Sequence, residues 1–147
     1  MFRHVLLPAD GSPLARKAIK AGIALASELG AKVTAYYALE TVQPYLYSEG
    51  FVINTAALRD FDRRARDQGM KYLARVEKAA RAAGVPCRTL LTKPATAYQG
   101  IVAAAKKQRC DLILMASHGR GELATLLLGS VTQKVLAHSK VPVLVYR

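Results

Sequence analysis

The segment MASHGRGELATLLLGSVTQK, residues 115–134, spaces glycines at 119, 121 and 129 through a stretch that otherwise favours a helix. Glycine weakens regular structure, and it is useful where the backbone takes a positive φ or approaches a ligand closely. Gly129 and Ser130 stand at the start of a predicted helix, whose first N–H groups and dipole favour an anion. We therefore predict a loop shaped around a phosphate group.

An acidic residue, Asp10, follows the first apolar run in the stretch VLLPADGS. An ionised carboxylate only accepts hydrogen bonds, so at a strand end it suits ribose hydroxyls, an adenine amino group or a magnesium ion. The alternative is that Asp10 caps the first helix together with Ser12. Arg120 also has two interpretations, because it either contacts a phosphate or is an exposed surface arginine.

Five apolar runs that alternate with helical periods must position these residues. The predicted strands are residues 2–7, 32–39, 87–91 and 111–117 and the stretch from Val141 to Tyr146. Alternation of strands and helices predicts an α/β fold, a doubly wound five-stranded parallel sheet with helices on both faces. In the common strand order 3-2-1-4-5, ligands bind outside the carboxyl ends of the first and fourth strands. The Asp10 loop and the glycine-rich loop border that crevice.

Four helices are predicted between the strands. The first begins after Ser12 with Pro13 and ends at Gly30, the third follows Thr96, and the fourth spans Ser130–His138. The second is long, and its predicted buried stripe consists of Leu58, Phe61, Ala65, Tyr72, Val76, Ala79 and Ala83. Residues 40–54 have no helical period, and a connection of this length is predicted to be a mobile loop.

Composition limits the class of protein. A chain of 147 residues with 52% hydrophobic content is the size of one domain, expected to span residues 1–147. Neither a bilayer-spanning run nor a signal peptide is recognisable, so a cytoplasmic protein is expected. Cys87 and Cys110 have no spacing typical of zinc sites or disulfide frameworks. The net charge of +12 favours acidic partners, but many of the charges alternate in sign along the second helix and are read as a solvated face rather than a nucleic-acid surface.

The chain resembles the universal stress protein family in its glycine pattern, G-x2-G-x9-G-S/T after the fourth strand, and in the aspartate after the first. Here the pattern reads Ala116, two residues, Gly119, nine residues, then Gly129 and Ser130. The resemblance covers essentially the whole chain and implies ATP in the crevice and a homodimer paired through the last strand, from Val141 to Tyr146. It implies that these residues bind the nucleotide: Pro8, Asp10, Ala38, Ala116, Ser117, His118, Gly119, Arg120, Gly129, Ser130, Val131 and Thr132, with Asp10 as the candidate Mg²⁺ ligand.

Ala116 departs from the family pattern, which has glycine at this position. A positive φ there would cost about 1 kcal/mol for a side chain, whereas a negative φ leaves only local crowding near the ligand. Two alternatives to ATP binding therefore stay open: a nucleotide-free interaction protein of the same fold, and a basic protein associated with nucleic acid.

Catalysis has weaker support in the sequence than binding has. The chain lacks the G-x-x-x-x-G-K-[ST] loop of efficient phosphoryl transfer, so at most slow ATP hydrolysis is expected. Asp10, His118 and Ser130 do occur in the order of one serine hydrolase class. However, no G-x-S-x-G elbow accompanies them, and no catalytic residue is assigned.

Overall fold

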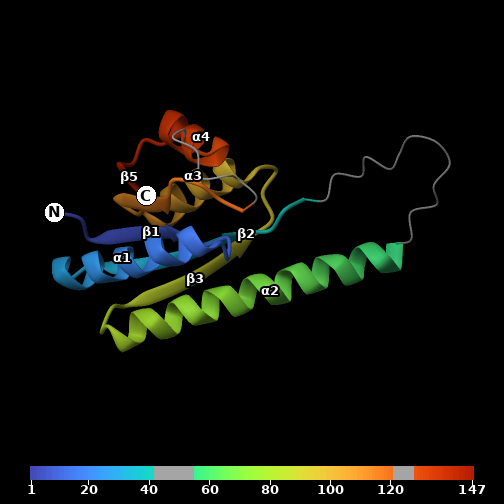
Figure 1. Ribbon diagram of the computed structural model, residues 1–147, viewed down its shortest axis with the longest axis horizontal. Helices are drawn as coiled ribbons and strands as arrows, with labels where there is room; N and C mark the ends of the chain where they lie inside the picture. Colours follow the sequence, from blue (N-terminus) through green and yellow to red (C-terminus); the bar gives the residue numbers. More distant parts are fainter. Residues whose placement is uncertain (42–54, 121–127) are drawn as a thin grey trace.

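The computed structural model describes residues 1–41, 55–120 and 128–147, and its five strands form one parallel sheet in the order β3-β2-β1-β4-β5 (Figure 1). The strands are β1 (His4–Pro8), β2 (Lys32–Ala38), β3 (Cys87–Thr92), β4 (Leu112–Ala116) and β5 (Val143–Tyr146). The helices are α1 (Pro13–Leu29), α2 (Thr55–Ala82), α3 (Ala97–Gln108) and α4 (Ser130–His138). The predicted doubly wound fold with strand order 3-2-1-4-5 is confirmed.

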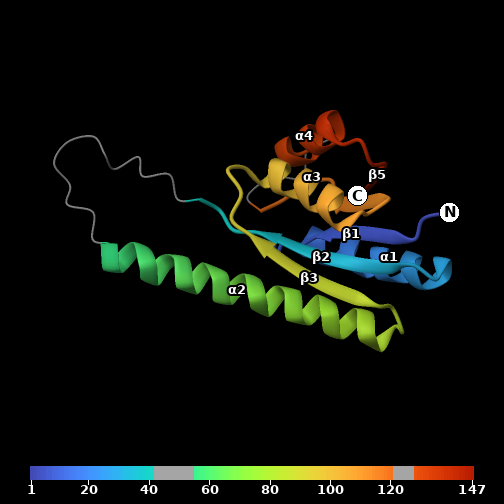
Figure 2. The ribbon, with the colours of Figure 1, turned by 180° about the vertical axis from the view of Figure 1, so that it is seen from behind.

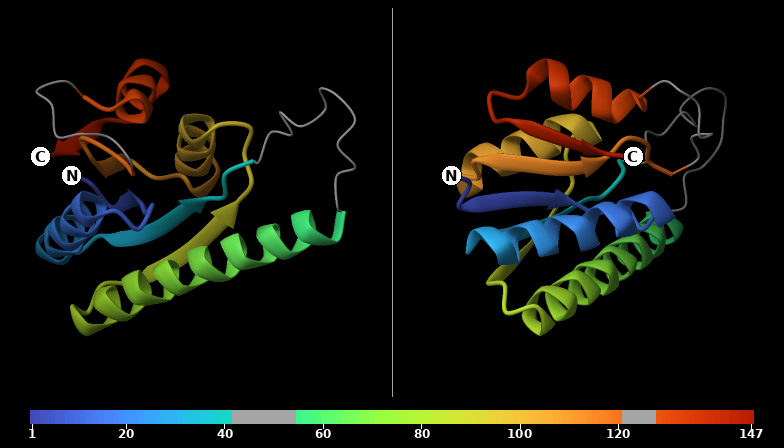
Figure 3. Two further views of the ribbon diagram at one scale, coloured as in Figure 1. Left: turned by 45° about the vertical axis from the view of Figure 1, so that its right-hand side comes forward. Right: turned by 60° about the vertical axis from the view of Figure 1, so that its left-hand side comes forward.

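Helices cover both faces of the sheet, as Figures 2 and 3 show. Helices α1 and α2 pack on one face and α3 and α4 on the other, so that alternate residues of β1, β2 and β4 enter two separate apolar clusters. Leu6 and Ile113, for example, belong to the α3 side, while Leu7 and Leu114 belong to the α1 side. Strands buried on both faces read as continuous apolar runs, which is why the sequence predicts them so directly.

Local signals at the ends of α1 act as the sequence predicts. Pro13 opens the helix, and the Ser12 hydroxyl accepts a hydrogen bond of 3.1 Å from the Ala15 N–H. Gly30 ends it in the left-handed conformation at φ +61°, a conformation that glycine adopts without a steric penalty. The start of α1 is thereby fixed beside the end of β1, which places the intervening Asp10 loop.

The predicted buried stripe of α2 is wrong at both ends, since Ala79 and Ala83 near its end are exposed as well as the residues of its first turns. Phe61 is 53% exposed and Leu58 is 38% exposed, whereas Leu73 and Ala80 farther along the helix are buried. The 28 residues of α2 span about 42 Å, but a six-residue strand such as β3 spans only about 20 Å. The first turns of α2 therefore extend beyond the carboxyl edge of the sheet (Figure 3).

Two expectations about the rest of the chain concern the long loop after β2 and membrane-spanning helices. The loop predicted at 40–54 lies, from residue 42 onward, outside the described residues. Within the part of the chain that the structure describes, no helix is both long and apolar enough to cross a bilayer.

Candidate functional site

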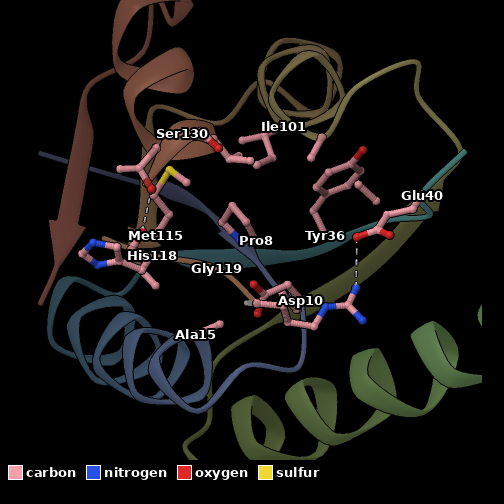
Figure 4. Close-up of a pocket in the computed structure, with 17 residues that line it drawn as sticks. Pro8, Asp10, Ala15, Tyr36, Glu40, Ile101, Met115, His118, Gly119 and Ser130 are labelled. Atoms are coloured by element: carbon pink, nitrogen blue, oxygen red, sulfur yellow. Dashed lines mark hydrogen bonds and ion pairs between the residues drawn. The ribbon is translucent and has the colours of Figure 1, made fainter. Parts of the chain in front are cut away.

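A cavity of about 250 Å³ opens at the carboxyl ends of β1, β2 and β4 (Figure 4). Ten of the predicted binding residues line it: Pro8, Asp10, Ala38, Ala116, His118, Gly119, Arg120, Ser130, Val131 and Thr132. Seven further lining residues were not predicted: Ala9, Ala15, Tyr36, Glu40, Ala97, Ile101 and Met115. The two loops expected to border the crevice, one after β1 and one after β4, do meet at this cavity.

Asp10 uses one carboxylate oxygen within its own loop. Its Oδ1 accepts a hydrogen bond of 2.8 Å from the Ser12 N–H, while Ser12 itself caps α1. Gly11 has a φ of +80°, and the Tyr72 ring lies so close that a Cβ at this position would collide with it. A side chain at Gly11 would be strained by the positive φ and would displace the Tyr72 ring.

Gly119 brings the loop after β4 close to Asp10. A Cβ built on Gly119 would lie 3.1 Å from Asp10 Oδ2, which is tighter than most real contacts of a Cβ atom. Gly119 is not among the described glycines with positive φ, which are Gly11, Gly30 and Gly84. Close approach between the two loops, and not an unusual backbone angle, accounts for the glycine here.

Helix α4 begins at the opposite wall of the cavity. Gly129 occupies the N-cap at φ −61°, and as a glycine it makes no side-chain cap. The Gly129 N–H donates to Ser117 O at 2.8 Å, and the Thr132 hydroxyl donates to Ala116 O at 3.0 Å. These two bonds tie the start of α4 to the end of β4, so that its first residues face the cavity.

Two predicted binding residues, Ser117 and Gly129, are not among the residues that line the cavity. Ser117 is 2% exposed, and its N–H donates to Tyr146 O at 2.8 Å, which extends the pairing of β4 with β5. Its hydroxyl lies 2.9 Å from His118 Nδ1. Gly129 is buried and bonded to Ser117. Both residues lie beneath the lining and position the groups that form it.

Ala116, where the family pattern has glycine, lies at the end of β4 opposite Tyr146 of β5. Among the described residues, the only non-glycine with positive φ is Arg109. The backbone at Ala116 is ordinary strand, so its methyl group causes no conformational strain. Ala116 is 7% exposed and lines the cavity, so its effect on a ligand is limited to local crowding.

The side chain of Arg120 lies toward the end of β2. One guanidinium nitrogen, Nη2, donates to the Tyr37 hydroxyl at 3.3 Å and lies 3.8 Å from Glu40 Oε1. Figure 4 shows Glu40 and Tyr36 on one side of the cavity and Ser130 and His118 on the other. In this conformation the guanidinium is therefore placed away from the α4 end of the cavity.

Tyr36 lines the cavity, although it was not among the binding residues predicted from the sequence. It is 1% exposed, and its hydroxyl shares a hydrogen bond of 2.8 Å with Thr92 Oγ1. Burial raises the pKa of this phenol, against a smaller lowering by the bond to Thr92. Tyr36 pairs with Pro8 across β1 and β2, so the strand register, which single-sequence periodicity does not provide, is the signal that connects them.

The chemistry of the cavity suits an anion with an apolar portion better than a bare metal ion. Within residues 1–41, 55–120 and 128–147, no group of three or more His, Cys, Asp or Glu side chains could hold a metal. Mg²⁺ is commonly bound through one or two carboxylates together with phosphates of a ligand. Asp10 and Glu40 are the two carboxylates among the described residues that line the cavity.

Comparison by sequence places the chain among known proteins. The model of the universal stress protein family matches residues 1–147. A universal stress protein of Thermus aquaticus is 34% identical over 151 residues, covering 100% of both chains. Another, from Methanocaldococcus jannaschii, is 32% identical over 149 residues, which are 100% of this chain and 83% of the relative.

Comparison by structure agrees with this fold. Universal stress protein UspA from Lactobacillus plantarum superposes with a TM-score of 0.83 at 19% identity, covering 99% of this chain and 98% of that chain. A universal stress protein described in complex with cAMP has a TM-score of 0.67 at 24% identity, covering 99% and 96%. One from Archaeoglobus fulgidus, described in complex with dAMP, has a TM-score of 0.62 at 15% identity, covering 100% and 98%.

Proposed function

The chain belongs to the universal stress protein family, and from this membership we propose that it binds ATP, with or without Mg²⁺, in the cavity at the carboxyl edge of the sheet. Binding would regulate its contacts with other proteins in a stress response. Two related structures are described with the nucleotides cAMP and dAMP, which supports the class of ligand. That the nucleotide is ATP goes beyond what these two relatives bind and is our proposal.

The start of α4 is the observation that carries this proposal. Ser130, Val131 and Thr132 line the cavity in the first turn of α4, whose N-cap residue, Gly129, has no side chain to cap it. The first N–H groups of a helix have no partner within the helix, and the helix dipole adds about half a positive charge there. A phosphate at this end satisfies both, while the apolar end near Tyr36 and Ile101 suits a base.

A binding role rather than fast turnover follows from the groups present. The sequence has no G-x-x-x-x-G-K-[ST] motif, and no lysine is among the described residues that line the cavity. Phosphoryl transfer depends on cations and on a positioned nucleophile around the transferred group. We therefore propose at most slow ATP hydrolysis.

Titration calorimetry with ATP and Mg²⁺ tests the proposal. A few charge-assisted hydrogen bonds, less the ordering costs, leave about 7–8 kcal/mol, which corresponds to a micromolar Kd. Gly119→Val places a branched side chain against Asp10 Oδ2 and is expected to weaken binding at least tenfold, with an unchanged far-ultraviolet spectrum. Absence of heat at millimolar ATP would instead favour a nucleotide-free interaction protein. Steeply salt-dependent retention of RNA or DNA would indicate the nucleic-acid alternative.

We also propose a homodimer through the last strand, from Val141 to Tyr146, and a cytoplasmic location. Strand β5 is at the edge of the described sheet, and Leu144 in its middle is 41% exposed. An apolar strand edge is a surface that natural proteins cover or pair. Pairing of two such edges about a two-fold axis covers both.

A further inference from the structure

Basic side chains line the amino edge of the sheet, opposite the cavity. In the right-hand view of Figure 3, the strands begin and the helices end on the side marked N. Every strand has one exposed cation there, within its first two residues or in the three residues before it. We call these cations the amino-edge row, which in sheet order consists of Arg88, Lys32, Arg3, Arg109 and Lys140. Because none lies on α2, the row is distinct from the charges that the sequence attributes to that helix.

The described surroundings do not neutralise the amino-edge row. Within the part of the chain that the structure describes, no member of the row forms an ion pair. Asp111 lies among them, but its two oxygens accept hydrogen bonds of 2.9 Å from the backbone N–H groups of Arg3 and His4. The carboxyl ends of the four helices add about half a negative charge each. The row, with Lys106 and Lys107 in the last turn of α3, exceeds that and leaves the edge positive.

An apolar groove lies at the β3 end of the row. It has a volume of about 320 Å³ and is lined by Gly84, Val85, Pro86 and Cys87, together with Glu77 and Arg81 of α2. The Pro86 carbonyl accepts a hydrogen bond of 2.8 Å from the Val33 N–H. This bond fixes the groove beside Lys32 and Arg88, which are the next residues along β2 and β3. Cationic and apolar surfaces therefore meet at this corner of the sheet.

We propose that the amino edge binds an extended acidic segment of a partner protein, with carboxylates on the amino-edge row and one apolar side chain in the groove. Neighbouring strands lie about 4.8 Å apart, so the row is about 19 Å long. An extended chain advances about 3.3 Å per residue and covers this length with about six residues. Three members of the row are arginines, whose planar guanidinium groups hold carboxylates in a bidentate manner.

The groove favours a peptide over nucleic acid as the occupant. A phosphate backbone neutralises cations but has no apolar group to place between Val85 and Pro86, and interfaces with nucleic acid are more polar than those between proteins. An acidic peptide that contains one large apolar residue satisfies both surfaces. The proposal goes beyond nucleotide binding and does not rest on it, because the row and the cavity are at opposite edges of the sheet.

Fluorescence anisotropy with a labelled peptide of six glutamates and a leucine at each end tests the proposal. We expect binding at about 50 mM salt that weakens about tenfold at about 300 mM, because exposed charges are screened. Lys32→Gln combined with Arg88→Gln should weaken binding at least about fivefold. The control combines Lys17→Gln on α1 with Lys71→Gln on α2, two exposed residues outside the row. It removes the same charge and should change the affinity less than twofold.

A peptide with glutamine in place of both leucines tests the groove without altering the protein, and it should bind at least about threefold more weakly. Absence of binding at about 50 mM salt, or equal losses in the two double variants, overturns the amino edge as a docking site. Unchanged affinity for the leucine-free peptide overturns the groove as part of it. A short DNA duplex that binds more tightly than the peptide at about 150 mM salt, and that the row substitutions weaken, replaces the acidic segment with nucleic acid. Peptide binding by a protein that gives no heat with ATP overturns the proposed nucleotide function and leaves this inference standing.

Discussion

Single residues at the site combine a structural and a candidate binding role, which is why their sequence pattern supports two interpretations. The sequence left open whether Asp10 caps α1 or meets a ligand, and in the structure the two carboxylate oxygens have different surroundings. Oδ1 bonds the Ser12 N–H, and Oδ2 lies toward Gly119. The type and position of Asp10 were predictable from the sequence. This difference was not, because it depends on how two loops far apart in the chain meet.

Ala116→Gly tests what the departure from the family pattern costs. Because Ala116 lies in β4 without positive φ, restoring glycine relieves no backbone strain. We expect ATP affinity within about threefold of wild type, and a loss of about 0.5–1 kcal/mol in the free energy of unfolding, since glycine weakens a strand interior. Calorimetry and urea denaturation measure the two effects. Recovery of binding only in the variant would show that crowding by the methyl group governs the site.

His4, at the amino end of β1 and away from the cavity, makes the free energy of unfolding depend on pH. Its Nε2 lies 2.8 Å from Thr34 Oγ1, and the side chain is 5% exposed. Burial, assisted by the nearby positive charges of Lys32 and Arg88, lowers its pKa below the usual 6.5, although the Asp111 carboxylate and the Arg109 carbonyl oppose this. Below pH 6.5 the unfolded chain therefore takes up a proton before the folded chain does, and stability falls as pH falls.

The expected loss is at most about 1.4 kcal/mol per pH unit below pH 6.5, measured as the free energy of unfolding in urea. His4→Gln keeps a hydrogen-bonding side chain near Thr34 but removes the titration, so it should lose less stability between pH 7.5 and pH 5.5. Asp111 adds its own dependence only at lower pH. Burial raises its pKa, but hydrogen bonds from the His4 and Arg3 N–H groups outweigh that and lower it from 3.8. Equal losses in wild type and variant would contradict this assignment.

At the scale of elements, local signals predicted most of what the structure contains. Ser12, Pro13 and Gly30 bound α1 as expected, because caps and turns depend on neighbouring residues alone. The apolar period of α2 locates its buried face only approximately, because Ala79 and Ala83 are exposed while Leu73 and Ala80 are buried, and it does not show where the sheet beneath the helix ends. Leu58 and Phe61 belong to that face and extend past the sheet. Packing partners are set by the lengths of other elements, which the period of one helix does not contain.

Substitutions along α2 should follow the observed burial and not the stripe predicted from the sequence. Phe61 is 53% exposed, so Phe61→Ser should change the free energy of unfolding by less than about 0.5 kcal/mol. Leu73 is 1% exposed within the α1-side cluster, and Leu73→Ala should cost about 2–5 kcal/mol. Urea denaturation of both variants makes the comparison. Similar losses would mean that Phe61 is covered in solution, by a partner or by a second copy of the chain.

At the scale of the whole molecule, alternation of strands and helices predicted a doubly wound parallel sheet, with the strand order 3-2-1-4-5 supplied by the common arrangement of such sheets. It also predicted the edge where the cavity lies. The seven unpredicted lining residues, Tyr36 and Ile101 among them, needed the register of β2 against β1 and the packing of α3. We propose that residues 1–147 unfold as one domain, since both apolar clusters share β1, β2 and β4.

Leu144→Glu tests the proposed homodimer that pairs two copies of β5. Leu144 is 41% exposed in the middle of β5, at the edge of the described sheet. In an antiparallel pair of these edges, residues near the two-fold axis face their own copies. Glutamates there would oppose each other, and like charges directly opposite across a strand pair are destabilising. Light scattering should therefore show a dimer for wild type and a monomer for Leu144→Glu.

The matched control is Leu136→Glu, because Leu136 is 40% exposed but lies on α4 rather than on β5. It should leave the dimer intact. A backbone variant, Val145→Pro, tests the same edge without adding charge. Pro142 and Tyr146 direct their carbonyl oxygens to β4, so by strand alternation the Val145 N–H points to the free edge, where proline removes a donor without breaking the β4 ladder. If both β5 variants remain dimeric, the subunits associate through another surface, and the exposed first turns of α2 are the next region to substitute.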